Sequence, residues 1–316
     1  MLLFGFAAIG AMQFAKPAAA RRPFRALHLR APEGAAAPNA FGTSGQVKLR
    51  FALPDEALDF PIEVAGDPST LAYQWVREDD GVPIESPRPL AGAPIAAPER
   101  PGFYHLALIR DSSREVLHEP TLAVMVPFQA KIGNWLNGYN IGTYLAERLG
   151  RADGRPEGFL EVTPENADLA VSRHFRLSDF ITHDEQGDVW PKYVALNPRL
   201  LDKLELVVAK LAAERGVPDL ALDVHSGFRT PAHNAEVRRA ARDSRHQYGD
   251  AADVVIDVNG DGKVTVTDEV LVAKAVEEVE EEHPELVGGL GLYTSRRYRT
   301  PYVHIDARGR RSRWRG

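Results

Sequence analysis

The spacing of the apolar residues changes near residue 127, and this change most limits what the chain can fold into. Before that point, segments such as 47–51, 72–76 and 104–109 alternate apolar and polar residues, and turns rich in Pro and Gly separate them. Period-two alternation is typical of strands with one buried face, and several such short strands are typical of a sandwich. The sequence therefore predicts a small antiparallel, all-β sandwich of the Ig-like kind over residues 46–127.

After residue 127 the pattern is mixed and predicts helices as well as strands. Apolar residues recur at helical spacing up to Arg215, and Gly216 follows as a C-cap. Helices are predicted over 200–215, 231–242 and 268–282, and short strands over 221–224, 254–256 and 302–305.

Leu2 to Ala15 form an apolar run that only Gly and Gln13 interrupt, and Ala18-Ala19-Ala20 then resemble a small-residue cleavage site. This run is too short for a comfortable membrane span, and the basic region that precedes most signal sequences is missing. We expect a secretory signal peptide or an N-terminal membrane anchor over residues 1–20, and a linker rich in Ala, Pro and Gly over 21–45. Export would place the protein in the periplasm or cell envelope.

Charge and cysteine content exclude several classes of protein. The net charge of −6 argues against a general nucleic-acid binder. No cysteine is present, so disulfides, thiolate ligands and cysteine nucleophiles are excluded, and any metal must be held by His, Asp or Glu. We expect a monomer. A basic patch near the C-terminus is interpreted as a solvated tail or a substrate rim: Arg308, Arg310, Arg311, Arg313 and Arg315.

Three side chains form a candidate metal site. Six residues separate His246 from Asp253, and His304 follows much later. Two imidazoles and one carboxylate leave the fourth tetrahedral position of a zinc ion open, which is typical of catalytic zinc. A His-x6-Asp pair is also common by chance, so spacing alone leaves both a metal site and unrelated structural residues open.

Several short motifs occur in order along the second half of the chain. They are Ser-Gly-Phe-Arg-Thr-Pro at 226–231, His-Asn at 233–234, Ser-x-His-x-x-Gly-x-Ala-x-Asp at 244–253, Gly-Leu-Gly at 289–291 and Val-His-Ile-Asp at 303–306. Together they resemble the zinc D-Ala-D-Ala carboxypeptidase and murein endopeptidase family, the LAS-type metallopeptidases, which are related to the hedgehog signalling domain. The resemblance covers about residues 130–316.

The resemblance implies an α+β fold with a small antiparallel sheet and helices, and a zinc peptidase domain over residues 128–316. It implies zinc on His246, Asp253 and His304. The implied activity is hydrolysis of peptide bonds in peptidoglycan stem peptides or cross-links, by a D,D-carboxypeptidase or an endopeptidase. The implied partner is the peptidoglycan peptide.

The resemblance also implies a role for Arg229, which would bind or orient a carboxylate or carbonyl of the substrate. A guanidinium suits this role because it is planar, permanently charged and able to bind in a bidentate manner. The alternative is a structural arginine that pairs with Asp223 or Asp253.

The general base departs from the family pattern. Many relatives carry an acidic residue three positions before the last ligand, and here that position is Pro301. Two candidates remain: Asp306, which shares a strand face with His304, and His225, which precedes the Ser-Gly-Phe-Arg motif. Asp306 is equally suited to orient His304. The departure keeps a second function open, a metal-retaining but non-catalytic cell-wall binding module.

A separate signal lies at residues 257–268. Oxygen-bearing side chains occupy positions 1, 3, 5 and 12 of a calcium loop, and Gly262 occupies position 6, as in EF-hand and dockerin modules. We interpret it as a calcium-loop insertion in the peptidase domain. The alternatives are an Asp-Asn-Gly turn without metal and a capping role for the last residue at the next helix. A calcium-dependent adhesion protein built on the β-sandwich is a third hypothesis. The predicted calcium ligands are Asp257, Asn259, Asp261, Lys263, Thr265 and Asp268.

Overall fold

The structure is a computed structural model that describes residues 41–58, 60, 67–151, 153–294 and 300–316. The predictions for residues 1–20, and for 21–45 as far as residue 40, lie outside the described residues. Residues 41–45 form turns, and the backbone N–H groups of Thr43 and Ser44 donate to the carboxylate of Asp202. None of the described helices is both long and apolar enough to cross a membrane.

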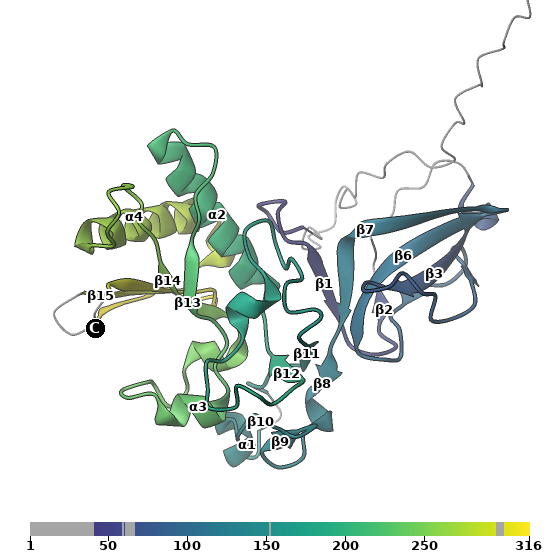
Figure 1. The fold of residues 1–316 in the computed structure, drawn as a ribbon, viewed down its shortest axis with the longest axis horizontal. Helices are drawn as coiled ribbons and strands as arrows, with labels where there is room; N and C mark the ends of the chain where they lie inside the picture. The colour runs from purple at the N-terminus through teal and green to yellow at the C-terminus, as the bar shows by residue number, and fades with distance from the viewer. Residues whose placement is uncertain (1–40, 59, 61–66, 152, 295–299) are drawn as a thin grey trace, which may run out of the picture.

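The strands before residue 127 lie at the right of Figure 1 and form two sheets. A five-stranded sheet has the order β1-β7-β6-β3-β4, and β2 pairs with β5. The predicted strands are present, but the pairing is not wholly antiparallel because β1 runs parallel to β7. The bounds are β1 (Leu49–Ala52), β2 (Ala57–Leu58), β3 (Ala72–Arg77), β4 (Arg88–Pro89), β5 (Ile95–Ala96), β6 (Gly102–Arg110) and β7 (Ser113–Val124).

Two apolar cores meet at this first sheet. Trp75, Leu106 and Leu122 belong to a core that is confined to the N-terminal strands. Leu49 and Ala123, on β1 and β7, belong instead to the large core that also contains the apolar residues of the later helices and strands. The strands before residue 127 are therefore packed against the rest of the described chain.

The sheet that carries the candidate ligands has the order β13-β14-β16-β15-β17. Its first four strands are antiparallel, whereas β17 runs parallel to β15 and so departs from the antiparallel sheet that the family resemblance implied. The bounds are β13 (Asp223–Ser226), β14 (Ala251–Val255), β15 (Gly289–Tyr293), β16 (Tyr302–Asp306) and β17 (Ser312–Arg315).

Period-two alternation along β16 separates the core face of this sheet from the site face. Val303 and Ile305 belong to the large core, and α4 packs on β15 and β16, with α2 packed against α4. His304 and Asp306 point to the other face, because successive strand residues alternate. The helices are α1 (Leu145–Arg148), α2 (Pro198–Arg215), α3 (Pro231–Glu236) and α4 (Val266–Glu282).

Helix ends follow local capping signals. Asn197 caps the start of α2, and Gly216 ends this helix in the left-handed conformation with φ of 66°, as predicted. α3 ends at Glu236 and not at residue 242 as predicted. Asn234, within α3, donates from Nδ2 to the carbonyl of Ala241 beyond the helix end, and Arg239 adopts a positive φ of 66°, which a helix does not allow.

The remaining strands complete the large core. A three-stranded sheet has the order β12-β11-β8, and β9 pairs with β10. Gly249 packs here, since a Cβ on it would lie 2.1 Å from the carbonyl oxygen of Ala195. This glycine therefore docks the turn before β14 onto the segment that leads into α2. The bounds are β8 (Val126–Pro127), β9 (Trp135–Leu136), β10 (Tyr139–Asn140), β11 (Gly158–Val162) and β12 (Lys192–Val194).

Candidate metal centre

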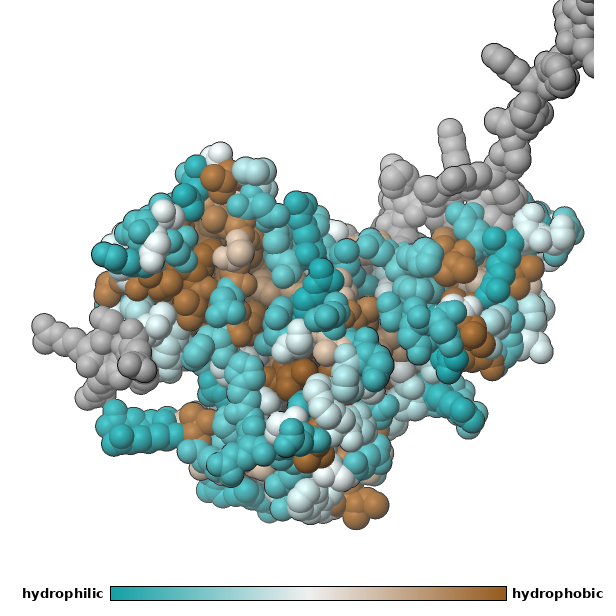
Figure 2. All heavy atoms as spheres, in the orientation of Figure 1, coloured by the Kyte–Doolittle hydropathy of each residue, from teal (hydrophilic) through white to brown (hydrophobic). Residues whose placement is uncertain are grey.

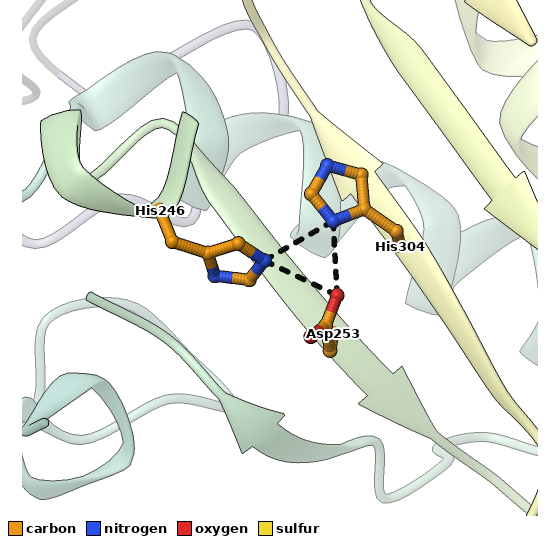
Figure 3. A group of neighbouring side chains, drawn as sticks. All are labelled: His246, Asp253 and His304. Atoms are coloured by element: carbon orange, nitrogen blue, oxygen red, sulfur yellow. Dashed lines mark hydrogen bonds and ion pairs between the residues drawn. The ribbon is translucent and has the colours of Figure 1, made fainter. Parts of the chain in front are cut away.

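His246, Asp253 and His304 converge from three elements of the fold. His246 lies in the 3-10 turn η4 (Arg245–Tyr248), Asp253 on β14 and His304 on β16 (Figure 3). All three are buried, and their candidate ligand atoms lie within 4.8 Å of one another. Among the described residues, no other group of three or more His, Cys, Asp or Glu side chains meets this condition.

The three facing atoms form a triangle with the size of one face of a zinc coordination shell. His246 Nε2 lies 3.1 Å from His304 Nδ1 and 3.2 Å from Asp253 Oδ1, and His304 Nδ1 lies 2.9 Å from the same oxygen. A tetrahedron with zinc–ligand distances of about 2.0–2.1 Å has edges of roughly 3.3 Å. The three residues therefore fit a tetrahedral metal ion with little movement.

Hydrogen bonds on the far side of each imidazole fix which nitrogen faces the centre. His246 Nδ1 donates to the carbonyl oxygen of Gly227 at 2.7 Å, since a carbonyl only accepts. His304 Nε2 donates to Asp306 Oδ2 at 3.2 Å. In each ring the other nitrogen turns its lone pair to the centre, as a metal ligand must.

Strand register lines up the site residues in one row across the sheet. Asp253 is paired with Ser226 on one side and with His304 on the other. His304 is paired with Gly291, which is paired with Trp314. A Cβ on Gly291 would lie 2.4 Å from the Trp314 ring, so this glycine lets the indole pack near His304, with ring centroids 5.1 Å apart.

Asp306 lies behind His304 rather than beside the facing atoms. Its carboxylate is fully buried, and it accepts hydrogen bonds from the backbone N–H of Gly289 and from the Arg308 guanidinium. Burial would raise the pKa of this carboxyl, but the bonds from His304 and Arg308 outweigh burial and hold the pKa far below its usual range. This position fits the orienting role that the sequence left open.

A buried ionic network supports the backbone of Asp306. Lys203 on α2 donates to the carbonyl of Asp306 and to Glu280 of α4, both at 2.7 Å. Arg313 on β17 binds Glu280 and Glu277. Arg308 and Arg313 are therefore paired and partly buried rather than part of a solvated tail, and Arg308 also lines a cleft beside the three candidate ligands, in agreement with the substrate-rim alternative. No sequence motif indicated this network, because its members are far apart in the chain.

Arg229 contacts the ligand set from the side of β13. Its Nη2 binds Asp253 Oδ2, and its Nε donates to Ser226 Oγ at 2.8 Å. This pairing with Asp253 is the structural alternative considered from the sequence. Arg229 also lines the cleft, and its Nη1 makes no hydrogen bond to a described residue. One guanidinium thus holds the carboxylate and borders the space where a substrate would lie.

Charge and burial act in opposite directions on the ligands. Burial alone would raise the pKa of the Asp253 carboxyl, but the adjacent His246 and His304 outweigh it, and the pKa lies well below its usual value. Burial lowers the pKa of His246, although Asp253 opposes this. For His304, burial also lowers the pKa, but Asp253 and Asp306 outweigh burial and raise it. An ionised carboxylate and a neutral imidazole are the forms that bind a metal, and the shifts of Asp253 and His246 favour these forms.

The metal centre opens into a cleft of about 510 Å³. Tyr293, Tyr302 and Trp314 line it, and the two tyrosine rings are stacked with centroids 4.5 Å apart. His225 is exposed, and its ring centroid lies 6.2 Å from that of Tyr302. His225 therefore lies at the end of this aromatic row and outside the ligand triangle.

The predicted calcium loop receives no support from its geometry. Asp257 accepts hydrogen bonds from the N–H groups of Gly260 and Gly262. Asp268 accepts from Val258 and Thr265, and it forms a capping box with Thr265 at the start of α4. The capping role for Asp268, one of the alternatives considered above, is thus the one seen. Asn259 and Asp261 accept turn hydrogen bonds in the exposed loop, where Lys263 also lies.

One comparison with known proteins bears on the family resemblance. Residues 174–281 match the family model described as Peptidase M15. Over these residues the chain is similar to the peptidase M15 family, so the resemblance stated from the sequence is confirmed. The match includes His246 and Asp253 and ends before His304. Peptidases of this family are zinc-dependent, in keeping with the donor set at the centre.

Other comparisons add little. No curated protein matches the chain. A solved structure, described as the crystal structure of the Serratia marcescens L-Ala D-Glu endopeptidase ChiX, is 21% identical, with 35% of this chain and 80% of that chain covered and a TM-score of 0.26. A likeness of this size carries no argument about fold or activity.

Asp306→Asn tests the orienting role. The substitution keeps the size of the side chain but removes the charge that fixes His304, and we expect the dissociation constant for zinc to rise about 10- to 100-fold. The measurement is a competition titration of the apoprotein with a zinc chelator. Asp219→Asn, at an exposed position, is the control. An unchanged zinc affinity in Asp306→Asn would refute the role.

Proposed function

We propose that the protein is a zinc-dependent peptidase that hydrolyses peptide bonds in peptidoglycan stem peptides or cross-links, as a D,D-carboxypeptidase or an endopeptidase. The observation that carries this proposal is the triangle of facing atoms on His246, Asp253 and His304 at the cleft. The match of residues 174–281 to the Peptidase M15 family model supports it.

Each residue of the site has a role in this proposal. Zinc, when bound by the three ligands, supplies Lewis acidity that polarises a carbonyl and lowers the pKa of a water molecule to about 7. Arg229 holds Asp253 through Nη2, and its Nη1 is placed to bind a carbonyl or carboxylate of the substrate. Asp306 keeps His304 in the tautomer that binds metal.

We assign proton transfer to His225 rather than to Asp306. The Asp306 carboxylate faces the ring nitrogen of His304 that points away from the other ligands, and Arg308 and Gly289 occupy its oxygens. A base must reach the reacting water or the leaving amine within hydrogen-bond distance. His225 is exposed beside Tyr302, which lines the cleft.

The central test combines metal content with activity. His246→Ala removes one side of the ligand triangle, so we expect the purified variant to lose bound zinc in elemental analysis and to give no clearing in a zymogram containing purified cell wall. His105→Ala is the matched control, because His105 is a buried histidine on β6 outside the site. An equal zinc content in the His246→Ala variant and the wild-type protein would contradict the assignment of His246 as a zinc ligand.

The zymogram also separates the alternative function. A chelator should abolish clearing by the wild-type protein, and added zinc should restore it. Failure of the intact, zinc-loaded protein to clear the wall would favour a metal-retaining, non-catalytic cell-wall binding module.

His225→Gln tests the base. We expect kcat to fall by roughly 10²- to 10⁴-fold, with zinc content unchanged, because a positioned base contributes about this much. The acidic limb of the profile of kcat against pH should vanish, since the group that must be deprotonated is gone. His118→Gln, at an exposed position on β7, is the control. A normal pH profile in His225→Gln would return the role of base to another group.

Calcium binding at residues 257–268 stays a prediction from the sequence. We propose weak binding through Asp257, Asn259, Asp261 and the carbonyl of Lys263, with Asp268 and Thr265 committed to the capping box. Calorimetric titration should give a dissociation constant of about 10⁻⁴–10⁻³ M, the range of extracellular modules. The Asp261→Ala variant should show no heat of calcium binding, whereas the control variant Asp243→Ala should bind calcium like the wild-type protein. Absence of heat with wild type would end the prediction.

The proposal includes the setting of the site. We propose that the protein is exported to the periplasm or cell envelope as a monomer, with residues 1–20 as signal or anchor, 21–45 as linker, 46–127 as an Ig-like sandwich and 128–316 as the peptidase domain. Leu49 and Ala123 belong to the large core, which supports a sandwich that packs against the peptidase domain rather than one that moves independently of it.

A further inference from the structure

The segment that follows α3 separates two hollows in the surface. On one side is the cleft that contains the ligand triangle. On the other is a second pocket of about 440 Å³, which Pro231, Asn234 and Gln247 help to line. Arg238 and Arg239 line both hollows. The loop after α3 stands out from the body of the protein in Figure 1, and the surface at the same place is hydrophilic in Figure 2.

Four arginines surround the second pocket: Arg148, Arg238, Arg239 and Arg242. We call this set the arginine ridge. All four are exposed, and none forms an ion pair or a side-chain hydrogen bond with a described residue. Glu236 is the one carboxylate that lines the pocket among the described residues. The ridge therefore carries a local excess of positive charge in a chain with a net charge of −6.

The arginines nearer the metal centre differ from the ridge. Each is neutralised by a carboxylate: Arg229 by Asp253, Arg245 by Asp250 and Arg308 by Asp306. Structural arginines in this protein are thus paired, whereas those of the ridge are available to a ligand. Guanidinium groups suit carboxylates because the planar fork binds both oxygens.

The backbone of Arg239 points to the same conclusion. Its φ is 66°, in the left-handed region that glycine adopts freely and that a residue with a side chain enters at a cost. No described residue pairs with its side chain, so the fold does not account for an arginine at this exposed turn. A residue kept at a strained position for what its side chain does is a candidate for binding.

Asn234 lines the second pocket and is buried. It is 5% exposed, and its Nδ2 donates to the carbonyl of Ala241, which fixes the orientation of the amide. Its Oδ1 is buried with no hydrogen-bond partner among the described residues. The second pocket therefore offers cations around its rim, which match the carboxylate of an acidic peptide, and one residue of its lining carries a buried acceptor with no partner among the described residues.

We propose that the arginine ridge is a specificity subsite, which binds a free carboxylate of the substrate peptide away from the scissile bond and selects acidic peptides. This inference rests on the proposed peptidase function, because Arg238 and Arg239 join the second pocket to the cleft. Arg238 and Arg239 act here on binding, and the ligand triangle acts on the reaction.

Arg239→Gly and the double variant Arg238→Gln with Arg239→Gly test the subsite. Glycine takes the φ of 66° without strain, so Tm should not fall. The probes are a synthetic stem pentapeptide with free carboxylates and the same peptide with its side-chain carboxylates amidated. We expect KM for the acidic peptide to rise on the order of tenfold for each lost charge-assisted contact, with kcat and the kinetics of the amidated peptide unchanged. Arg114→Gln, an exposed arginine on β7, is the control.

Direct binding separates failure of the subsite from failure of the peptidase function. Calorimetric titration of zinc-loaded protein with each peptide gives Kd without requiring turnover. Tighter binding of the acidic peptide by wild type, lost in the double variant, supports the ridge even if neither peptide is cleaved. Equal Kd for the two peptides in wild type, an equal loss for both peptides in the double variant, or a lower Tm in Arg239→Gly would overturn the proposal.

Discussion

The candidate site depends on the register between β14 and β16. In an antiparallel pair of strands, directly opposed residues share one face of the sheet. A shift of the register by one residue would move the side chains of one strand to the opposite face. The observed register opposes Asp253 and His304, and the same register puts Val254 opposite Val303 on the face that packs against the helices. Burial of that apolar face, worth about 25 cal/mol for each Å² removed from water, therefore also fixes the two metal ligands.

The sequence predicted the ligands and the helix α2 because those signals are local or carried by motifs. Apolar spacing and Gly216 define the helix, and the ordered motifs define His246, Asp253 and His304. The row that joins the ligands to Gly291 and Trp314 was not predictable, because pairing between distant strands depends on the packing of the whole sheet. The early end of α3 was missed for the same reason, since tertiary contacts outweigh the periodic pattern.

The structure explains why residues without a side chain occupy both ends of the Gly-Leu-Gly motif. A Cβ on Gly289 would lie 2.1 Å from Asp306 Oδ2, and one on Gly291 would meet the Trp314 ring. The first glycine makes room for the carboxylate that orients His304, and the second for an aromatic wall of the cleft. The two glycines of the motif thus leave room for the side chains of Asp306 and Trp314. This role could not be predicted from the sequence, because it depends on which distant residues pack against the glycines.

Buried charge explains how a site with a carboxylate on each side of His304 stays ordered. Asp253 is neutralised by Arg229 through one oxygen and leaves the other for the metal ligands. Asp306 is neutralised by Arg308, and its backbone is held by Lys203, which Glu280 neutralises in turn. Because an unpaired buried charge is costly, Arg229, Arg308 and Lys203 are each paired with a carboxylate. The arginines of the ridge keep their charge for an incoming ligand, and together with Nη1 of Arg229 they supply positive charge at the surface that a substrate would meet.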